Sequence, residues 1–137
     1  MKIALVADDK RKELMAQFCI AYCGILSKHS LCSTGITGKY IEDATGLEIE
    51  KMLTGSQGGV QQIASMISYD EVDMLIYMRD PTAEHSDASR ETNETLLRLC
   101  DIHSVPAATN IATAEMLILG LDRGDLAWRN IVTPQKR

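Results

Sequence analysis

The stretch "VDMLIYM", residues 72–78, is the most hydrophobic strand candidate in the chain, and "RDP" follows it. A short, nearly continuous apolar run is typical of a strand that is buried on both faces of a parallel sheet. A second run, "KIALVA" at residues 2–7, is followed by two acids. These two runs predict central parallel strands whose carboxyl ends carry polar side chains.

Segments with helical spacing of apolar residues alternate with strand candidates along the rest of the chain. Helices are predicted from residue 9 to just before 30, over 39–44, 60–68 and 90–103, and from 111 to near 120. Further strands are predicted at "LCS", 31–33, "LEIEKML", 47–53, and "VPAA", 105–108. This alternation predicts a single three-layer α/β domain over 1–137, with a mainly parallel sheet and helices on both faces.

Composition excludes several classes of function. At 137 residues the chain is large enough to bury a core, and 45% of its residues are hydrophobic. An aromatic share of 4% and a net charge of −5 argue against a nucleic-acid partner. The N-terminus does not match a signal peptide, and no apolar stretch approaches membrane-spanning length. We expect a cytoplasmic protein with no membrane partner.

The cysteines do not form a recognisable metal motif. Cys19 and Cys23 lie one helical turn apart, which could serve a metal, but no histidine or second cysteine pair completes a site. The alternative is that all four cysteines are buried free thiols, which are common in protein cores. We therefore expect no metal and no cofactor.

Polar loops are expected at the carboxyl edge of the sheet, where open α/β sheets bind ligands. Five segments fall there: "ADDK", "STGITG", "TGSQGG", "RDPTAEH" and "ATNIAT". All are rich in Gly, Thr, Ser or Asp. Their convergence predicts a polar binding site and does not depend on any one motif.

Two of these loops have the composition of an anion site. Thr34 and Thr37 flank glycines, so that hydroxyl and backbone N–H groups can point at one anion ahead of a helix. "TGSQGG", with Thr54 and Gly55, offers the same groups. Either loop taken alone can also be an ordinary turn with a helix cap. Lys12 can supply the cation, or it can be a solvated surface lysine.

The acids have structural alternatives of their own. Asp9 can be a helix N-cap and Asp8 a turn residue. Asp80 follows the most apolar strand, where an acid is costly unless another group satisfies it or a reaction uses it. His85 lies in a polar loop and can be merely exposed.

The whole set of motifs resembles one enzyme family over almost the entire chain. "KIALVADDKRK", "STGITG", "EDATGLEIE", "TGSQGGVQQIA", "DMLIYMRDP" and "VPAATNIATAE" occur in the order found in methylglyoxal synthases. The resemblance implies the same fold, a homohexamer, and conversion of dihydroxyacetone phosphate to methylglyoxal and phosphate. The same fold also occurs in regulatory and purine-pathway domains that bind phosphorylated nucleotides.

Carried over by position, the resemblance assigns phosphate binding to Lys12, Thr34, Thr37, Thr54 and Gly55. It assigns catalytic roles to Asp9 and Asp80, which match aspartates of the family. Ile36 stands where the family has another threonine, so one hydroxyl is missing.

The departures from the family fall on the chemistry. The family reads "GGDQQ" where this chain has "GGVQQ", so Val60 replaces the aspartate that acts as general base. Asp8 replaces a histidine after the first strand. The family's other histidine has no clean counterpart; His85 is the nearest candidate, in a loop over 82–93 that is about two residues longer.

Two functions follow from this pattern. The first is a binding protein that holds a phosphorylated small molecule, such as a nucleotide, without transforming it, because valine cannot accept a proton. The second is an active methylglyoxal synthase in which Asp8 or Asp9 serves as base. A relic without a ligand is a third reading, which the retained phosphate-binding positions disfavour.

Overall fold

A five-stranded sheet with order β3-β2-β1-β4-β5 forms the centre of the computed structural model, which describes residues 1–132. The strands are β1 Lys2–Ala7, β2 Ser30–Ser33, β3 Glu50–Lys51, β4 Met74–Met78 and β5 Ala107–Ala108. Every pairing is parallel. The two apolar runs, β1 and β4, are neighbours at the centre, from Ile3 beside Met74 to Ala7 beside Met78.

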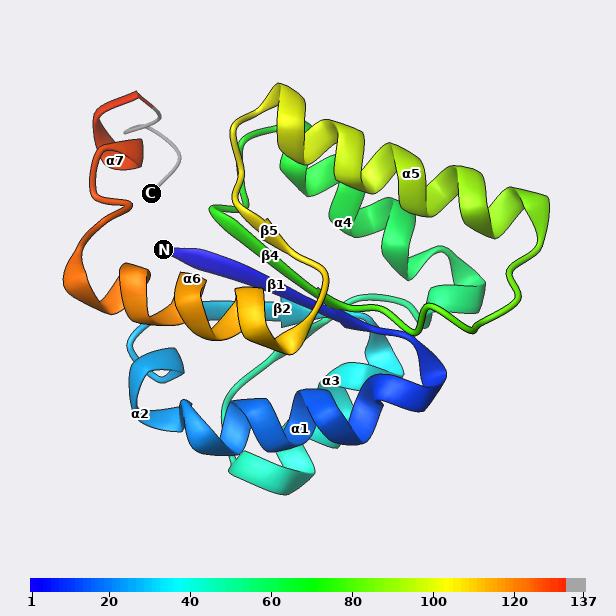
Figure 1. Cartoon of the computed structure of the whole chain (residues 1–137), viewed down its shortest axis with the longest axis horizontal. Coiled ribbons are helices and arrows are strands. Elements are labelled where there is room, and N and C mark those ends of the chain that lie inside the picture. Colours follow the sequence, from blue (N-terminus) through cyan, green and yellow to red (C-terminus); the bar gives the residue numbers. More distant parts are fainter. Residues whose placement is uncertain (133–137) are drawn as a thin grey trace.

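Helices cover both faces of the sheet, as predicted (Figure 1). They are α1 Lys12–Ala21, α2 Cys23–Leu26, α3 Gly35–Thr45, α4 Gly59–Ser68, α5 Asp87–Ile102, α6 Ile111–Arg123 and α7 Arg129–Val132, with 3₁₀ turns η1 Asp9–Arg11 and η2 Gly55–Gln57. Alternate β1 side chains point to opposite faces. Ile3 and Leu5 pack with α1, α2, α3 and α6, whereas Ala4 and Val6 pack with α4 and α5.

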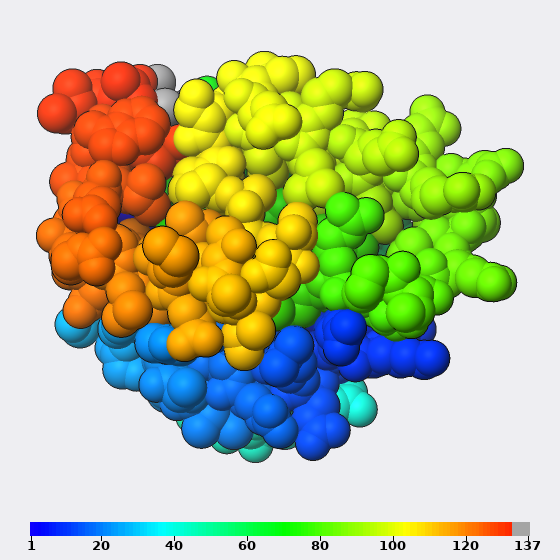
Figure 2. Space-filling model, viewed as in Figure 1, coloured from blue at the N-terminus to red at the C-terminus, as the bar shows by residue number. Residues whose placement is uncertain are grey.

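The outer surface of two of these layers is visible in one view. Figure 2 shows the side chains of α1, α6 and α5 covering the molecule, so that the sheet is hidden behind them. Three-layer α/β architecture is therefore confirmed, with each face of β1 and β4 buried.

Three predicted boundaries are wrong. The strand expected over 47–53 is reduced to β3, because an edge strand pairs on one side only, here with Cys32 and Ser33. The loop expected at "TGITG" is already helix, since α3 begins at Gly35. The loop expected from residue 82 ends at Ser86, whose hydroxyl oxygen accepts a hydrogen bond from the Ser89 N–H at 3.1 Å and caps α5.

The first predicted helix is also interrupted. It consists of η1, α1 and α2, and the break between α1 and α2 falls at Tyr22. Gly24, one of the weakest helix formers, lies two residues after the break, inside α2. The hydrophobic face is nevertheless continuous across it, because Phe18 and Leu26 join the same core.

Helix α7 was not predicted, and one buried arginine anchors it. Arg129 is 1% exposed, and its Nε donates to Asp73 Oδ1 at 3.3 Å. Its Nη1 donates to the carbonyl of Ser104, and Asp73 Oδ2 accepts from the Lys2 N–H at 2.8 Å. This cluster lies at the amino ends of β1 and β4, opposite the predicted binding edge.

Two other expectations concern the residues that the structure describes. Within 1–132, no helix is long and apolar enough to cross a membrane. The cysteines are free; Cys19, Cys32 and Cys100 are buried, and Cys23 is partly exposed. Burial raises the pKa of each of the three buried thiols to about 12, so they remain protonated core groups at neutral pH.

Candidate functional site

A cavity of about 920 Å³ opens at the carboxyl edge of the sheet. Its lining comes from the segments that follow β1, β2, β3 and β4, and from α4 and α5. The fifth predicted segment, "ATNIAT", does not contribute to the lining. A second depression of about 760 Å³ lies around Lys2 and His29 and includes none of the predicted site residues.

We call one side of the cavity the Thr/Gly wall; it consists of Lys12, Thr34, Ile36, Thr54, Gly55 and Ser56. Thr34 is the N-cap residue of α3, yet among residues 1–132 its side chain makes no capping hydrogen bond. The first N–H groups of a helix have no intrahelical partner and attract negative charge. At the start of α3 the Gly35 N–H already donates to the Leu53 carbonyl at 3.1 Å, so the N–H groups of Ile36 and Thr37 are the donors that remain.

The second loop of the Thr/Gly wall is folded tightly onto its own backbone. The carbonyl of Thr54 accepts hydrogen bonds from the N–H groups of Gln57 and Gly59, both at 2.9 Å. A Cβ at Gly59 would lie 2.0 Å from the carbonyl oxygen of Leu53, so only glycine fits there. A Cβ at Gly55 would meet no atom within 4 Å, which leaves open space beside its backbone.

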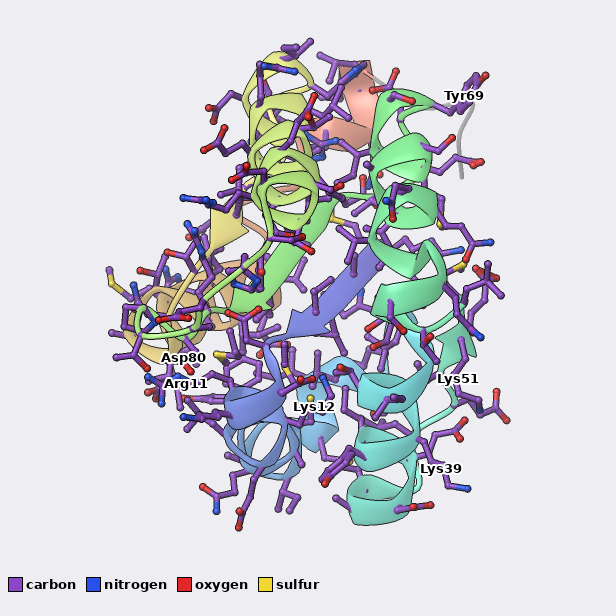
Figure 3. The ribbon with its side chains drawn as sticks, turned by 90° about the vertical axis from the view of Figure 1, so that its right-hand side faces the viewer. Arg11, Lys12, Lys39, Lys51, Tyr69 and Asp80 are labelled. Atoms are coloured by element: carbon purple, nitrogen blue, oxygen red, sulfur yellow. The ribbon has the colours of Figure 1, made fainter. Side chains whose placement is uncertain are left out.

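Lys12 is held inside the site and is not a solvated lysine. Its side chain is 13% exposed, and its Nζ lies 3.0 Å from the Ala7 carbonyl and 3.4 Å from Asp9 Oδ1. Figure 3 looks onto the carboxyl edge and shows Lys12 between α1 and α3, whereas Lys39 and Lys51 lie at the outer side of the molecule. The structure therefore places one ammonium group beside the two Thr/Gly loops.

Thr37 differs from the other predicted phosphate-binding residues. It is fully buried in the first turn of α3 and does not line the cavity. Its Oγ1 has no hydrogen-bond partner within the part of the chain that the structure describes. A contact between Thr37 and phosphate stays a prediction.

We call the opposite side the acid wall; it consists of Asp8, Asp9, Tyr77, Asp80 and His85. Asp8 is its centre. Asp8 Oδ1 accepts from the Tyr77 hydroxyl at 2.9 Å, and Oδ2 accepts from the Asp80 N–H at 2.8 Å. His85 Nε2 lies 3.8 Å from Asp8 Oδ2, so the loop after β4 folds back onto the end of β1.

The other two acids have contrasting surroundings. Asp80 Oδ1 accepts from the hydroxyl of Thr82 at 2.7 Å and from its N–H at 2.9 Å. These hydrogen bonds hold the pKa of Asp80 below its ordinary value, which makes it a weaker base. The side chain of Asp9 is fully exposed and contacts Lys12. Figure 3 shows Asp80 beside Arg11 at the rim.

Val60 lies on the cavity lining in the first turn of α4, and its side chain also packs against the core cluster on that face. An alkyl group there can neither accept nor donate a proton. The structure thus confirms that the position borders the same space as Lys12 and Asp8, and that its chemistry is apolar.

Sequence reasoning missed the cavity residues of α4 and α5, and it missed Tyr77. Gln61, Ala88, Ser89, Thr92 and Asn93 all line the cavity. Residues 88–89 fell in a predicted loop, and Tyr77 is simply one position of an apolar strand. Serine is a favoured N-cap residue that accepts a hydrogen bond from the N–H group three residues later. Ser86, three residues before Ser89, was therefore the sequence signal that α5 begins before residue 90. Among residues 1–132, no cluster of three metal-ligating side chains occurs.

The carboxyl edge of a parallel α/β sheet is where open α/β folds bind their ligands, and this chain has a polar cavity there. A family profile described as "MGS-like domain" matches residues 15–109. A methylglyoxal synthase of Caldicellulosiruptor saccharolyticus is 58% identical over 98% of this chain and 94% of its own length. One from a Geobacillus species is 51% identical over 99% of this chain and 96% of its own length.

A solved structure agrees with these sequence matches. The crystal structure of methylglyoxal synthase from Elizabethkingia anophelis superposes with a TM-score of 0.76 at 35% identity, over 85% of this chain and 76% of that one. The chain therefore belongs to the methylglyoxal-synthase-like family.

Proposed function

We propose that this protein binds a phosphorylated small molecule in the cavity and has lost the lyase reaction. The observation that carries the proposal is Val60, which borders the cavity where the family resemblance puts the general base. Positioned acid–base groups contribute about 10²–10⁴ in rate. A site that keeps its anion donors and lacks its base is suited to holding a phosphate ester, for sequestration or for regulation.

The geometry of the remaining acids supports the same proposal. Both carboxylate oxygens of Asp8 accept hydrogen bonds from the protein, which favours a structural use of this side chain. Asp80 is a weakened base, and the side chain of Asp9 is fully exposed to water.

An active methylglyoxal synthase is the second candidate. It is favoured by the 58% identity to a protein that bears this name. In that case Asp8 would release one of its hydrogen bonds, or Asp9 would turn inward from Lys12, when dihydroxyacetone phosphate binds.

Two measurements on the natural protein separate the candidates. Formation of methylglyoxal from dihydroxyacetone phosphate is followed first, and we expect none above the uncatalysed rate. Calorimetric titration with inorganic phosphate, dihydroxyacetone phosphate and nucleoside monophosphates then tests binding, and we expect saturable heat. Turnover would establish an active methylglyoxal synthase. Absence of both turnover and binding heat would establish a protein that has kept the fold without a ligand.

We further propose the homohexamer that the family resemblance implies. Ile20 on α1 and Met116 on α6 are 54% and 74% exposed, and these two helices cover the same face of the sheet. Exposed apolar side chains of this size are available for subunit contacts. Light scattering coupled to size exclusion should give six times the mass of 15.1 kDa; a monomer mass would contradict the proposal.

A further inference from the structure

The first turns of α5 form a third side of the cavity, which we call the α5 wall. It consists of Ala88, Ser89, Thr92 and Asn93. Thr92 Oγ1 donates to the Ala88 carbonyl at 3.0 Å and accepts from Gln61 Nε2 at 3.5 Å. The wall is neutral and composed of small side chains, and three of its four members can form hydrogen bonds.

Asn93 is the residue of this wall whose hydrogen-bonding capacity is unused. The residue is only 9% exposed and borders the cavity, and among residues 1–132 no hydrogen bond involves its side-chain amide, whose atoms are not among the fully buried polar atoms without a partner. The amide is therefore reached by solvent from the cavity and is available to a ligand there. A carboxamide presents two donors and an acceptor, so its natural partner both donates and accepts, as a hydroxyl group does.

Charge around the cavity restricts what can lie against the α5 wall. Both lysines of the lining, Lys10 and Lys12, belong to the segment after β1. The α5 wall itself carries no cation, and the nearby loop contributes Glu84 together with His85, which faces Asp8. A second phosphate or a carboxylate would find no counter-charge there, whereas neutral hydroxyl groups would be accepted.

The size of the cavity points the same way. Sites for drug-sized ligands measure roughly 300–1,000 Å³, and this cavity, at about 920 Å³, is near the upper end. A three-carbon phosphate held at the Thr/Gly wall leaves most of that space empty. A longer ligand can contact the Thr/Gly wall and the α5 wall at once.

We propose that the ligand is a phosphate ester of a polyhydroxylated carbon skeleton, whose phosphate binds the Thr/Gly wall and whose hydroxyl groups bind Asn93 on the α5 wall. The shared chemistry is that of a sugar phosphate, either free or as the ribose phosphate of a nucleotide. The proposal rests on the proposed function, because it names the substrate class of the same site.

Calorimetry with four probes tests it: inorganic phosphate, n-butyl phosphate, ribose 5-phosphate and adenosine 5′-monophosphate. The natural protein is compared with Asn93→Leu, which keeps the size and removes the amide. Gln17→Leu, the same kind of change on the exposed side of α1, is the matched control. Asn93→Ser serves as a second variant if Asn93→Leu melts early.

We expect ribose 5-phosphate to bind the natural protein and Gln17→Leu about tenfold more tightly than n-butyl phosphate. Asn93→Leu should abolish that difference and leave the affinity for n-butyl phosphate unchanged. Equal affinity for the two esters in the natural protein would overturn the proposal, as would a variant that weakens both esters equally or neither.

The remaining outcomes are also decisive. Binding of phosphate and n-butyl phosphate without a preference for ribose 5-phosphate would leave the proposed function standing and remove this inference alone. Absence of binding by all four probes would remove both. Tighter binding of the nucleotide than of ribose 5-phosphate identifies a nucleotide as the source of the ribose phosphate, and weaker binding identifies a free sugar phosphate.

Discussion

The Thr/Gly wall and the acid wall face the same cavity but are built from different parts of the chain. The Thr/Gly wall is built on backbone that is held by its own hydrogen bonds, as from the Gln57 and Gly59 N–H groups to the Thr54 carbonyl, and by a position, Gly59, where only glycine fits. The acid wall relies on side chains, each of which a single substitution can replace. A single substitution can therefore change the chemistry of the acid wall without disturbing the fold, whereas the backbone of the Thr/Gly wall depends on the fold itself.

The largest expected effect comes from restoring a carboxylate between the two walls. Val60→Asp should raise methylglyoxal formation from dihydroxyacetone phosphate by about 10²–10⁴ over the natural protein, because it returns a general base to the cavity. Val60→Asn has nearly the same shape without the basicity and should stay inactive. Equal activity in both variants would show that polarity alone, and not proton transfer, was missing.

The next effect concerns the one ammonium group of the Thr/Gly wall. Lys12→Met should weaken binding of inorganic phosphate about 10- to 100-fold, which corresponds to the ~1.5–3 kcal/mol of a hydrogen bond to a charged group. Lys39→Met removes the same charge from the exposed side of α3 and should change calorimetric affinity little. If the two variants weaken binding equally, general electrostatics and not the position of Lys12 sets the affinity.

Tyr77→Phe tests the acid wall alone, because it leaves every residue of the Thr/Gly wall unchanged. Loss of the hydroxyl that donates to Asp8 should lower the free energy of unfolding by about 1–2 kcal/mol and leave phosphate affinity intact. Burial, and then the Asp8 carboxylate, raises the pKa of Tyr77. The stabilisation that the Tyr77 hydroxyl gives to the folded state is therefore complete below the ordinary tyrosine pKa of 10.0, and it is lost as pH rises above that value.

Urea titrations at pH 8 and pH 11 measure this contribution of Tyr77. The natural protein should lose more stability between these values than Tyr77→Phe does. Tyr69→Phe is the control, because Tyr69 is 67% exposed and should follow the natural protein. A fall in phosphate affinity in Tyr77→Phe would mean that a change in the acid wall alters binding at the Thr/Gly wall.

The smallest effect is expected at low pH. The hydrogen bonds from Thr82 hold the pKa of Asp80 below 3.8, so its contribution to stability is present above that value and is lost as pH falls through the folded-state pKa. Asp80→Asn should therefore show a shallower loss of stability between pH 5 and pH 2. Asp43→Asn, at an exposed position of α3, should retain the natural acid sensitivity.

Some strands and helices could be predicted from the sequence, and others could not. Strands β1 and β4 were predictable because both faces of each are buried, which leaves an apolar run that few other structures produce. The edge strand β3 was predicted within 47–53, but its length was not, since that length depends on pairing with β2 and not on its own alternating pattern. Helix α7 was missed because one buried ion pair, between Arg129 and Asp73, anchors it in place of an apolar stripe.

For the candidate site, convergence of four polar segments on one edge followed from topology alone. The partners of individual side chains did not. That Asp8 bonds to Tyr77 and Asp80 depends on the register of β1 against β4, which the sequence does not state. Asn93 escaped notice because it is a polar residue within "SDASRETNE", and only the packing of α5 shows that it is buried.

The separation along the chain between Asp8 and its partners has a consequence for protein synthesis. The hydrogen bonds from Tyr77 and Asp80 to Asp8 span 69 and 72 residues, and β1 has β4 as one of its two neighbours in the sheet. On the ribosome, β1 and β2 can pair early, while the other edge of β1 stays open until residues 74–78 emerge. An open apolar edge invites association with other chains. The speed of translation through the middle of the message therefore bears on how much protein reaches the folded state.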